Sequence, residues 1–267
     1  MSTTSEVAPP TVATGDAGPV LAGRSGRRSL AGYLFMPVLL TVVLIALFFT
    51  VRSRELSSGE QNRLGLDNIL QKFREHLEVT VVSTLLVLLL AIPLGILLTR
   101  SFARAITPPA IAVFNVGQAV PSIGLIALIA IVFNKIGFLP VVVALVAYTI
   151  LPVLRNTMVG LRQVDASVIE SARGMGMTRT AVLLRIELPL AVPIIMAGLR
   201  TALTINVGTA TLGAFIGAGG LGELIVAGFV QNKQLILVVG AVLVAALALF
   251  IDYLASIAED VLRPRGL

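Results

Sequence analysis

Six long runs of apolar residues, separated by shorter polar segments, dominate the pattern along this chain. The runs cover residues 31–51, 79–99, 111–133, 139–159, 191–216 and 235–255. Each run approaches or exceeds the length of about 20 residues with which an α-helix crosses the hydrocarbon layer at a rise of roughly 1.5 Å per residue. The pattern therefore predicts an all-α membrane protein, a polytopic bundle of about six transmembrane helices.

The segments outside the runs differ in character. Residues 1–30 are rich in Ser, Thr, Pro, Gly and Ala, which predicts a disordered cytoplasmic tail. The first run, 31–51, is followed by "RSREL" rather than by a small-residue cleavage site, which favours an uncleaved helix over a signal peptide. Residues 52–78 are polar and balanced in charge, and we expect an extracytoplasmic loop there. A short cytoplasmic tail is expected over residues 259–267.

The distribution of basic residues predicts the orientation. If the N-terminus is inside, the inside segments hold twelve Lys and Arg residues and the outside segments hold seven. Cytoplasmic loops carry the excess of basic residues in membrane proteins. Both termini are therefore expected in the cytoplasm, with the chain in the cell inner (plasma) membrane.

Composition agrees with this class and excludes several kinds of site. The chain has 267 residues, 57% hydrophobic and 13% charged, and its mean hydropathy is +0.98. In such a chain a net charge of +6 reflects loop orientation rather than nucleic-acid binding. The lack of Cys excludes disulfides and thiolate metal sites, and the single His, His76, argues against a histidine metal cluster. We expect no catalytic residue, metal or cofactor.

One charged, glycine-punctuated segment, "IESARGMGMTRTAVLLRIELP", lies between two of the most apolar runs. Asp165 is a good N-cap for a first short helix, which Gly174 and Gly176 should end. Thr178 can cap a second helix that runs to Pro189. An apolar face of the first helix, if exposed, suggests either docking of a partner protein or a helix lying on the lipid surface. The residues of that face are Val168, Ile169, Ala172 and Met175.

The spacing within this segment resembles the hallmark pattern of permease subunits of type I ABC importers. That pattern is Glu-Ala-Ala, three residues, Gly, nine residues, Ile, one residue and Leu-Pro, and Ser171 in place of Ala is the one departure. The resemblance covers residues 75–260 and implies a five-helix permease core, residues 79–258. Its cytoplasmic coupling loop, residues 160–189, would fit a cleft on a separate ATPase subunit. The implied coupling positions are Glu170, Ser171, Ala172, Gly174, Met175, Gly176, Ile186, Leu188 and Pro189.

Two glycine patterns have alternative interpretations. "GAGGLG", Gly217–Gly222, fits the dinucleotide pattern, but a membrane run precedes it and an apolar run follows, which favours a glycine-rich turn on the outer face. Gly213 and Gly217 form a G-x-x-x-G pair that can let helices approach closely. The chain contains no Gly-Lys dipeptide and therefore no P-loop, so ATP should be hydrolysed on another subunit.

Polar groups inside apolar runs are costly and often functional. Asn206 lies deep in its run, and we expect it either to face the translocation path or to hydrogen-bond between helices. Arg200 is expected to pair or to extend to the membrane surface. The candidates for the path are Gln118, Pro121, Asn206 and Thr209.

Three stretches together resemble the osmoprotectant branch of these permeases, which imports glycine betaine, choline, carnitine and related quaternary amines. They are "GQAVPSIGLIALI", "AYTILPVLRNTMVGLRQVDASVIESARGMGMT" and "INVGTATLGAFIGAGGLGELI". Parts of these sequence patterns also occur in methionine and other amino-acid permeases, which remain the alternative. A self-sufficient secondary transporter and an intramembrane enzyme fit less well, because intramembrane carboxylates are few and Cys is absent.

The aromatic content bears on where the substrate is recognised. A quaternary ammonium ion is best held by aromatic faces, and this chain has no Trp and three Tyr. Recognition should therefore lie on a separate extracytoplasmic binding protein, as the resemblance implies. The other expected partners are two cytoplasmic ABC ATPase subunits, a second permease subunit (a copy or a paralogue) and membrane lipid.

Overall fold

A computed structural model describes residues 30–262, and every regular element in that range is a helix. The predicted tail over residues 1–30 lies outside the described residues except for Leu30, and the last five residues also lie outside. The elements are α1 (Leu30–Arg52), α2 (Ser58–Leu64), α3 (Leu66–Thr99), η1 (Ser101–Ala103), α4 (Thr107–Ala119), α5 (Ser122–Phe133), α6 (Phe138–Arg162), α7 (Ala166–Gly174), α8 (Arg179–Val182), η2 (Leu183–Glu187), α9 (Leu188–Ala210), η3 (Thr211–Ile216), α10 (Gly222–Val230) and α11 (Gln234–Leu262).

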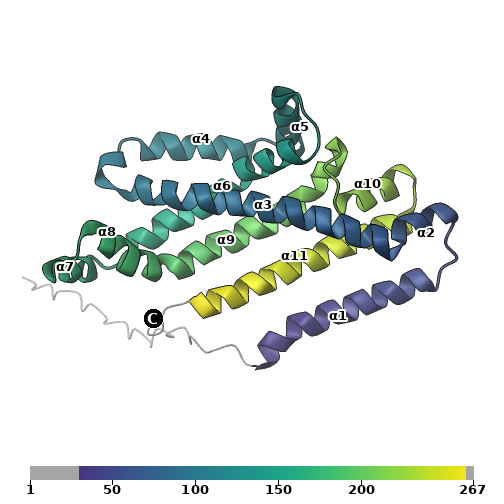
Figure 1. Ribbon diagram of the computed structural model, residues 1–267, viewed down its shortest axis with the longest axis horizontal. Coiled ribbons are helices and arrows are strands. Elements are labelled where there is room, and N and C mark those ends of the chain that lie inside the picture. Colours follow the sequence, from purple (N-terminus) through teal and green to yellow (C-terminus); the bar gives the residue numbers. More distant parts are fainter. Residues whose placement is uncertain (1–29, 263–267) are drawn as a thin grey trace, which may run out of the picture.

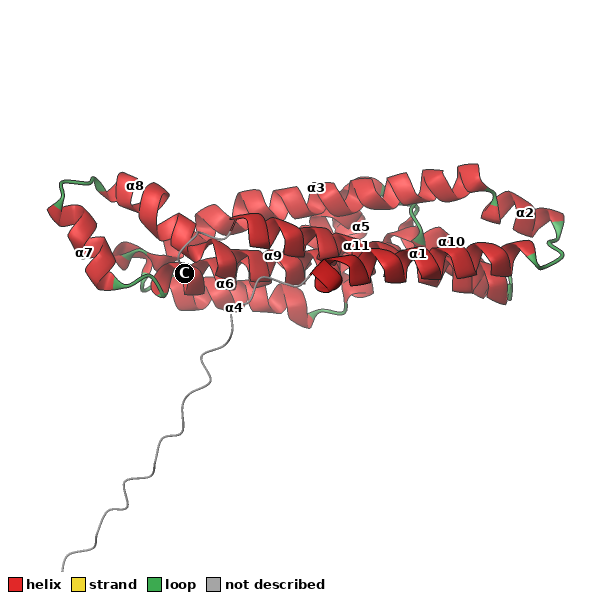
Figure 2. Cartoon of the chain, turned by 90° about the horizontal axis from the view of Figure 1, so that it is seen from below, coloured by secondary structure: helices red, strands yellow, loops and turns green. Residues whose placement is uncertain are grey.

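The long helices lie side by side in an elongated bundle with two distinct ends (Figures 1 and 2). Helices α7 and α8 protrude at one end, which we call the α7–α8 end, whereas α2 and α10 lie at the other, the α2–α10 end. Helix α6 is central and packs against α3, α9, α4 and α5. Helix α1 contacts the bundle mainly along α11.

Five helical segments are long and apolar enough to cross a membrane, and a sixth candidate is a bent pair. The pair is α4 and α5, which meet at 102°. The bend falls at Pro121, as the sequence predicts, although residues 111–133 were expected to form one interrupted span. Val120 is extended, with φ −72° and ψ 132°, because a following proline disfavours the helical conformation of the residue before it.

The start of α3 corrects one prediction. Residues 52–78 were expected to form a polar loop, but α2 occupies part of this segment and α3 begins at Leu66 rather than at residue 79. The polar residues in the first turns of α3 have partners on neighbouring elements: Lys72 pairs with Glu75 and with Glu223 of α10. Tertiary contacts therefore stabilise as helix a stretch whose composition indicates a loop.

Small residues allow the central helices to approach closely. A Cβ atom on Gly95 of α3 would lie 2.7 Å from Thr157 of α6. A Cβ atom on Gly198 of α9 would lie 2.7 Å from Asn156 of α6. Small residues at such contacts are typical of helix packing in membranes. They fix α6 tightly between α3 and α9.

Candidate functional site

The corner between α7 and α8 is built from local signals that the sequence predicts. The side chain of Asp165 accepts a hydrogen bond from the backbone amide of Ser167 at 2.8 Å and so caps α7. This hydrogen bond holds the pKa of Asp165 below its usual range. At the other end of α7, Gly176 has φ +85°. The amides of Gly176 and Met177 donate to the carbonyls of Arg173 and Ala172, which together form a Schellman motif.

The second helix was predicted to run as far as Pro189. In the structure, α8 instead continues through η2 into α9. Thr178 caps α8 through a hydrogen bond from Ala181 at 3.3 Å. A five-residue π-helical turn, η2, then joins α8 to α9, and Pro189 lies in the first turn of α9. Ile186 and Leu188 are half-buried, and Leu188 packs on a small core cluster around Ala191. The corner is thus rigidly continuous with a membrane-spanning helix.

The predicted apolar face of α7 is divided between an inner and an outer side. Ala172 is only 1% exposed, whereas Met175 is 76% and Val168 is 41% exposed. The exposed positions of the candidate coupling set are Glu170, Ser171, Gly174, Met175 and Gly176. Figure 2 shows α7 and α8 at the extreme end of the molecule, beyond the long helices. The corner therefore offers a small, protruding, mixed polar and apolar surface.

An ion pair that sequence reasoning missed braces this corner. Arg100, which follows the last residue of α3, donates to Glu187 at 2.8 Å, and Glu187 is only 5% exposed. The pair borders a cleft of about 450 Å³ that Arg173 and Arg179 also line. The sequence did contain a signal for this pair: Glu187 is the one acidic residue in the apolar stretch "LLRIELPL", and a carboxylate buried among apolar residues needs a charged or hydrogen-bonding partner. The brace joins α3 to the segment between α8 and α9.

Asn206 of α9 is fully buried and joins three helices. Its amide nitrogen donates to Thr84 of α3 at 3.0 Å, and Thr149 of α6 donates to its amide oxygen at 3.1 Å. All three side chains are buried in the core. The structure therefore shows the hydrogen bond between helices, which is one of the two interpretations offered for Asn206, and its side chain is fully buried.

The other path candidates lie on α4, at the α4–α5 bend and on α9. Gln118 of α4 donates to the carbonyl of Tyr148 on α6 at 3.1 Å, next to the exposed Pro121. Thr209 is half-buried near the end of α9. Gln118 and Pro121 lie at the α4–α5 bend, and Ala210, which follows Thr209, packs in the same core cluster as Val120 and Tyr148.

Arg200 pairs, as expected, and its partners lie on the last helix. Two guanidinium nitrogens each lie 3.0 Å from a carboxylate oxygen of Asp252, and a third lies 3.3 Å from Glu259. A bidentate pair of this kind fixes α9 against α11 in one orientation.

The glycine-rich segment forms a turn against α3 at the α2–α10 end. Gly217, Gly219 and Gly220 all have positive φ, so the segment is a tight turn and no strand precedes it within residues 30–262. The backbone amide of Gly220 donates to Glu75 of α3 at 2.9 Å. Gly213 packs beside Val141 of α6, whereas no described side chain approaches Gly217. The turn interpretation is therefore confirmed over the dinucleotide one.

Comparison with known proteins agrees with this architecture. Residues 91–265 match the family model of the binding-protein-dependent transport system inner membrane component. The choline transport system permease protein OpuBB of Bacillus subtilis (strain 168) is 41% identical over 199 residues, covering 74% of this chain and 90% of that protein. The osmoprotectant import permease protein OsmY of Salmonella typhimurium is 43% identical over 183 residues, covering 68% and 77%.

Solved structures show the same fold. A chain of the MetNI methionine ABC transporter in an inward-facing conformation superposes with a TM-score of 0.68 at 22% identity, covering 78% of this chain and all of that one. The prediction of an all-α, type I ABC importer fold is confirmed by this likeness and by the family match. The chain belongs to the family of inner membrane components of binding-protein-dependent transport systems.

Proposed function

We propose that this chain is the permease subunit of an ATP-driven importer of osmoprotectants, which are quaternary amines such as glycine betaine, choline or carnitine. The observation that carries the proposal is the identity of about two residues in five with permeases named for these solutes. The glycine betaine/carnitine/choline permease protein OpuCB of Bacillus subtilis (strain 168), for example, is 40% identical over 199 residues. The structural likeness to a methionine transporter is lower in identity and supports the fold alone.

The α7–α8 corner is the contact for a separate ATPase subunit in this proposal. It protrudes from the bundle, exposes Glu170 and Met175, and continues through η2 into α9. A force applied to the corner would therefore act on a membrane-spanning helix without an intervening loop. The Arg100–Glu187 pair would carry the same displacement to α3. ATP is hydrolysed on the partner, because this chain lacks a P-loop.

The translocation path, in the same proposal, runs beside the α4–α5 bend. Gln118 and Pro121 line it there, and Thr209 lines it near the end of α9. Asn206 shapes the path from within the core by holding α3, α6 and α9 together. A second permease subunit completes the path, and an extracytoplasmic binding protein delivers the substrate at the α2–α10 end.

Transport by the reconstituted complex tests the proposal. The purified chain, its ATPase and its binding protein are placed in proteoliposomes, and uptake of labelled glycine betaine, choline, carnitine and methionine is measured with and without ATP. We expect ATP-dependent accumulation of at least one quaternary amine. Accumulation of methionine alone would favour the amino-acid alternative, and equal uptake without ATP would favour a secondary transporter. Tight betaine binding to this chain alone would contradict recognition by a separate protein.

A further inference from the structure

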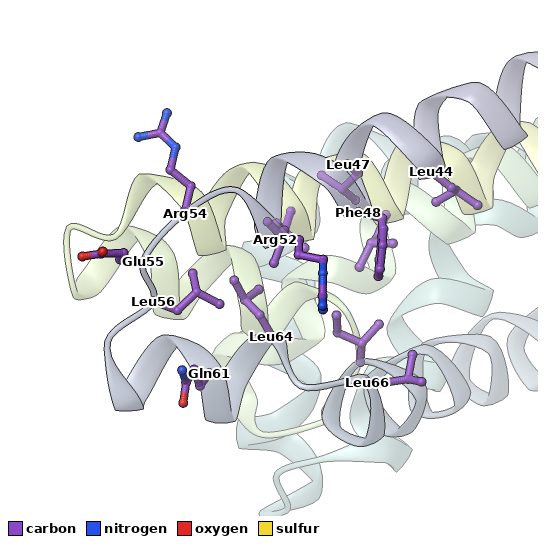
Figure 3. A pocket seen from close by; sticks show the side chains of 14 residues that line it. Leu44, Leu47, Phe48, Arg52, Arg54, Glu55, Leu56, Gln61, Leu64 and Leu66 are labelled. Atoms are coloured by element: carbon purple, nitrogen blue, oxygen red, sulfur yellow. The ribbon is translucent and has the colours of Figure 1, made fainter.

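A cavity of about 780 Å³ lies between the second half of α1 and helices α2, α3 and α11 (Figure 3). We propose that it binds a membrane phospholipid with a negatively charged headgroup. Its volume falls within the range of roughly 300–1,000 Å³ that is typical of small-molecule sites. The proposal is independent of the transported solute.

The walls of the cavity suit a hydrocarbon chain. They are mainly aliphatic and come from α1, α2, α3 and α11, with Leu44, Phe48, Leu64, Leu66, Ile69 and Leu243 among the lining residues. Helix α1 is long and apolar enough to cross a membrane, so its final turns lie at the level of lipid chains and headgroups. The molecules available to an apolar cavity at that depth are lipids.

The way α1 is attached explains why the cavity lies at one end. Near its start, the hydroxyl of Tyr33 donates to Asp260 at 2.8 Å, and Tyr253 donates to the carbonyl of Tyr33 at 2.9 Å. Leu40 is only 7% exposed and packs α1 into the bundle nearby. Leu44 and Phe48, further along α1, are 43% and 60% exposed although they border the cavity. The first half of α1 thus has hydrogen bonds to α11, whereas in the second half Leu47 and Val51 pack on the core and Leu44 and Phe48 stay exposed beside the cavity.

Arg52 indicates the charge of the headgroup. It is the last residue of α1, and in Figure 3 its side chain extends across the cavity toward Leu66 at the start of α3. No carboxylate within residues 30–262 forms an ion pair with it, and the side chain of Glu55 at the rim points away. A guanidinium group binds a phosphate through two parallel hydrogen bonds. A phospholipid whose chain enters the cavity would place its phosphate beside Arg52.

Lipid retention measured by native mass spectrometry tests the site. The full chain, purified in detergent, is titrated with phosphatidylglycerol or with phosphatidylcholine. We expect preferential retention of phosphatidylglycerol, and Arg52→Gln should lower that retention about tenfold, the loss expected for a charge-assisted contact of about 1.4 kcal/mol. Arg74→Gln is the matched control, because Arg74 is exposed on α3 and is not among the residues that line the cavity, so this change should leave retention unchanged.

A second pair of variants tests the apolar part. Leu44→Trp places a larger side chain at the cavity wall, whereas Val42→Trp makes the same change on the exposed surface of the same helix. We expect Leu44→Trp to reduce retention of phosphatidylglycerol and Val42→Trp to leave it unchanged, with both proteins monodisperse. Equal retention by Arg52→Gln and Arg74→Gln, equal retention by the two Trp variants, or equal binding of both lipids by the wild type would overturn the proposal.

Discussion

Gly176 is the position in the α7–α8 corner whose backbone conformation is least compatible with any other amino acid. Its φ of +85° is strained for any residue with a side chain, and no described heavy atom lies within 4 Å of a Cβ placed there. Backbone strain of about 1–3 kcal/mol, rather than a clash, therefore opposes substitution. We expect Gly176→Val to displace the corner, reduce co-purification of the ATPase about tenfold and abolish most uptake, with normal membrane insertion.

Two further variants make this prediction specific. Gly174 has no positive φ and equally open surroundings, so Gly174→Ala should keep the backbone of the corner and reduce ATPase association and uptake much less than Gly176→Val does. Glu170→Lys reverses an exposed charge on the same surface and should weaken association without altering the corner. Full association and full uptake by both Gly176→Val and Glu170→Lys would show that the corner does not couple the subunits, and would favour a helix on the lipid surface.

Asn206 is the buried polar residue that links three helices of the bundle through its side-chain amide. Replacing it by Leu removes its hydrogen bonds to Thr84 and Thr149, which remain buried. Hydrogen bonds between membrane helices contribute about 0.6–2 kcal/mol each. We expect Asn206→Leu to lower the free energy of unfolding by about 1–3 kcal/mol and so to lower the Tm in detergent. Thr201→Ala, an exposed change on the same helix, is the control and should leave the Tm unaltered.

At the scale of elements, local signals were sufficient to predict both caps of the corner and the break at Pro121. They were insufficient for α3, because the composition of its first turns is typical of a loop. Contacts of Lys72 with Glu223 and of Glu75 with Gly220 stabilise these turns as helix. The partners of Asn206 could not be predicted for the same reason, since Thr residues are common and only the packing of α3, α6 and α9 selects two of them. Contacts between elements distant in the sequence were the missing information.

The Arg100–Glu187 pair supports a prediction about how elements move together. Glu187→Gln removes the charge that holds Arg100 and should loosen the joint between α3 and η2. We expect lower uptake per ATP hydrolysed, because the ATPase still binds the intact corner while its displacement reaches α3 incompletely. The measurement compares the ratio of uptake to hydrolysis for wild type and variant.

Exchanging the two charges is the control for this ion pair. Arg100→Glu combined with Glu187→Arg keeps opposite charges together and should recover part of the lost ratio, whereas either single reversal should not. A Glu187→Gln protein with an unchanged ratio would mean that α3 and η2 move together without this contact.

At the scale of the whole molecule, the α7–α8 end carries the basic residues that the charge bias assigns to the cytoplasm. Arg100, Arg173 and Arg179 lie there around one cleft. A reporter inserted after Gly176 should therefore report a cytoplasmic location, and one inserted after Glu55, in the turn between α1 and α2, the opposite side. Both positions lie outside the long helices, so insertion should not disturb a span. Reversed locations would overturn the orientation and the ATPase contact together.

Helix α3 is long enough to link contacts on the two sides of the membrane. Its 34 residues form one helix of about 50 Å, longer than the roughly 30 Å hydrocarbon layer. Glu75 near one end holds the glycine turn, and Arg100 just beyond the other holds Glu187. Thermodynamic linkage makes any coupling between the two surfaces reciprocal. If a protein bound at the glycine turn changes the affinity at the α7–α8 corner by a given factor, a protein bound at the corner must change the affinity at the glycine turn by the same factor.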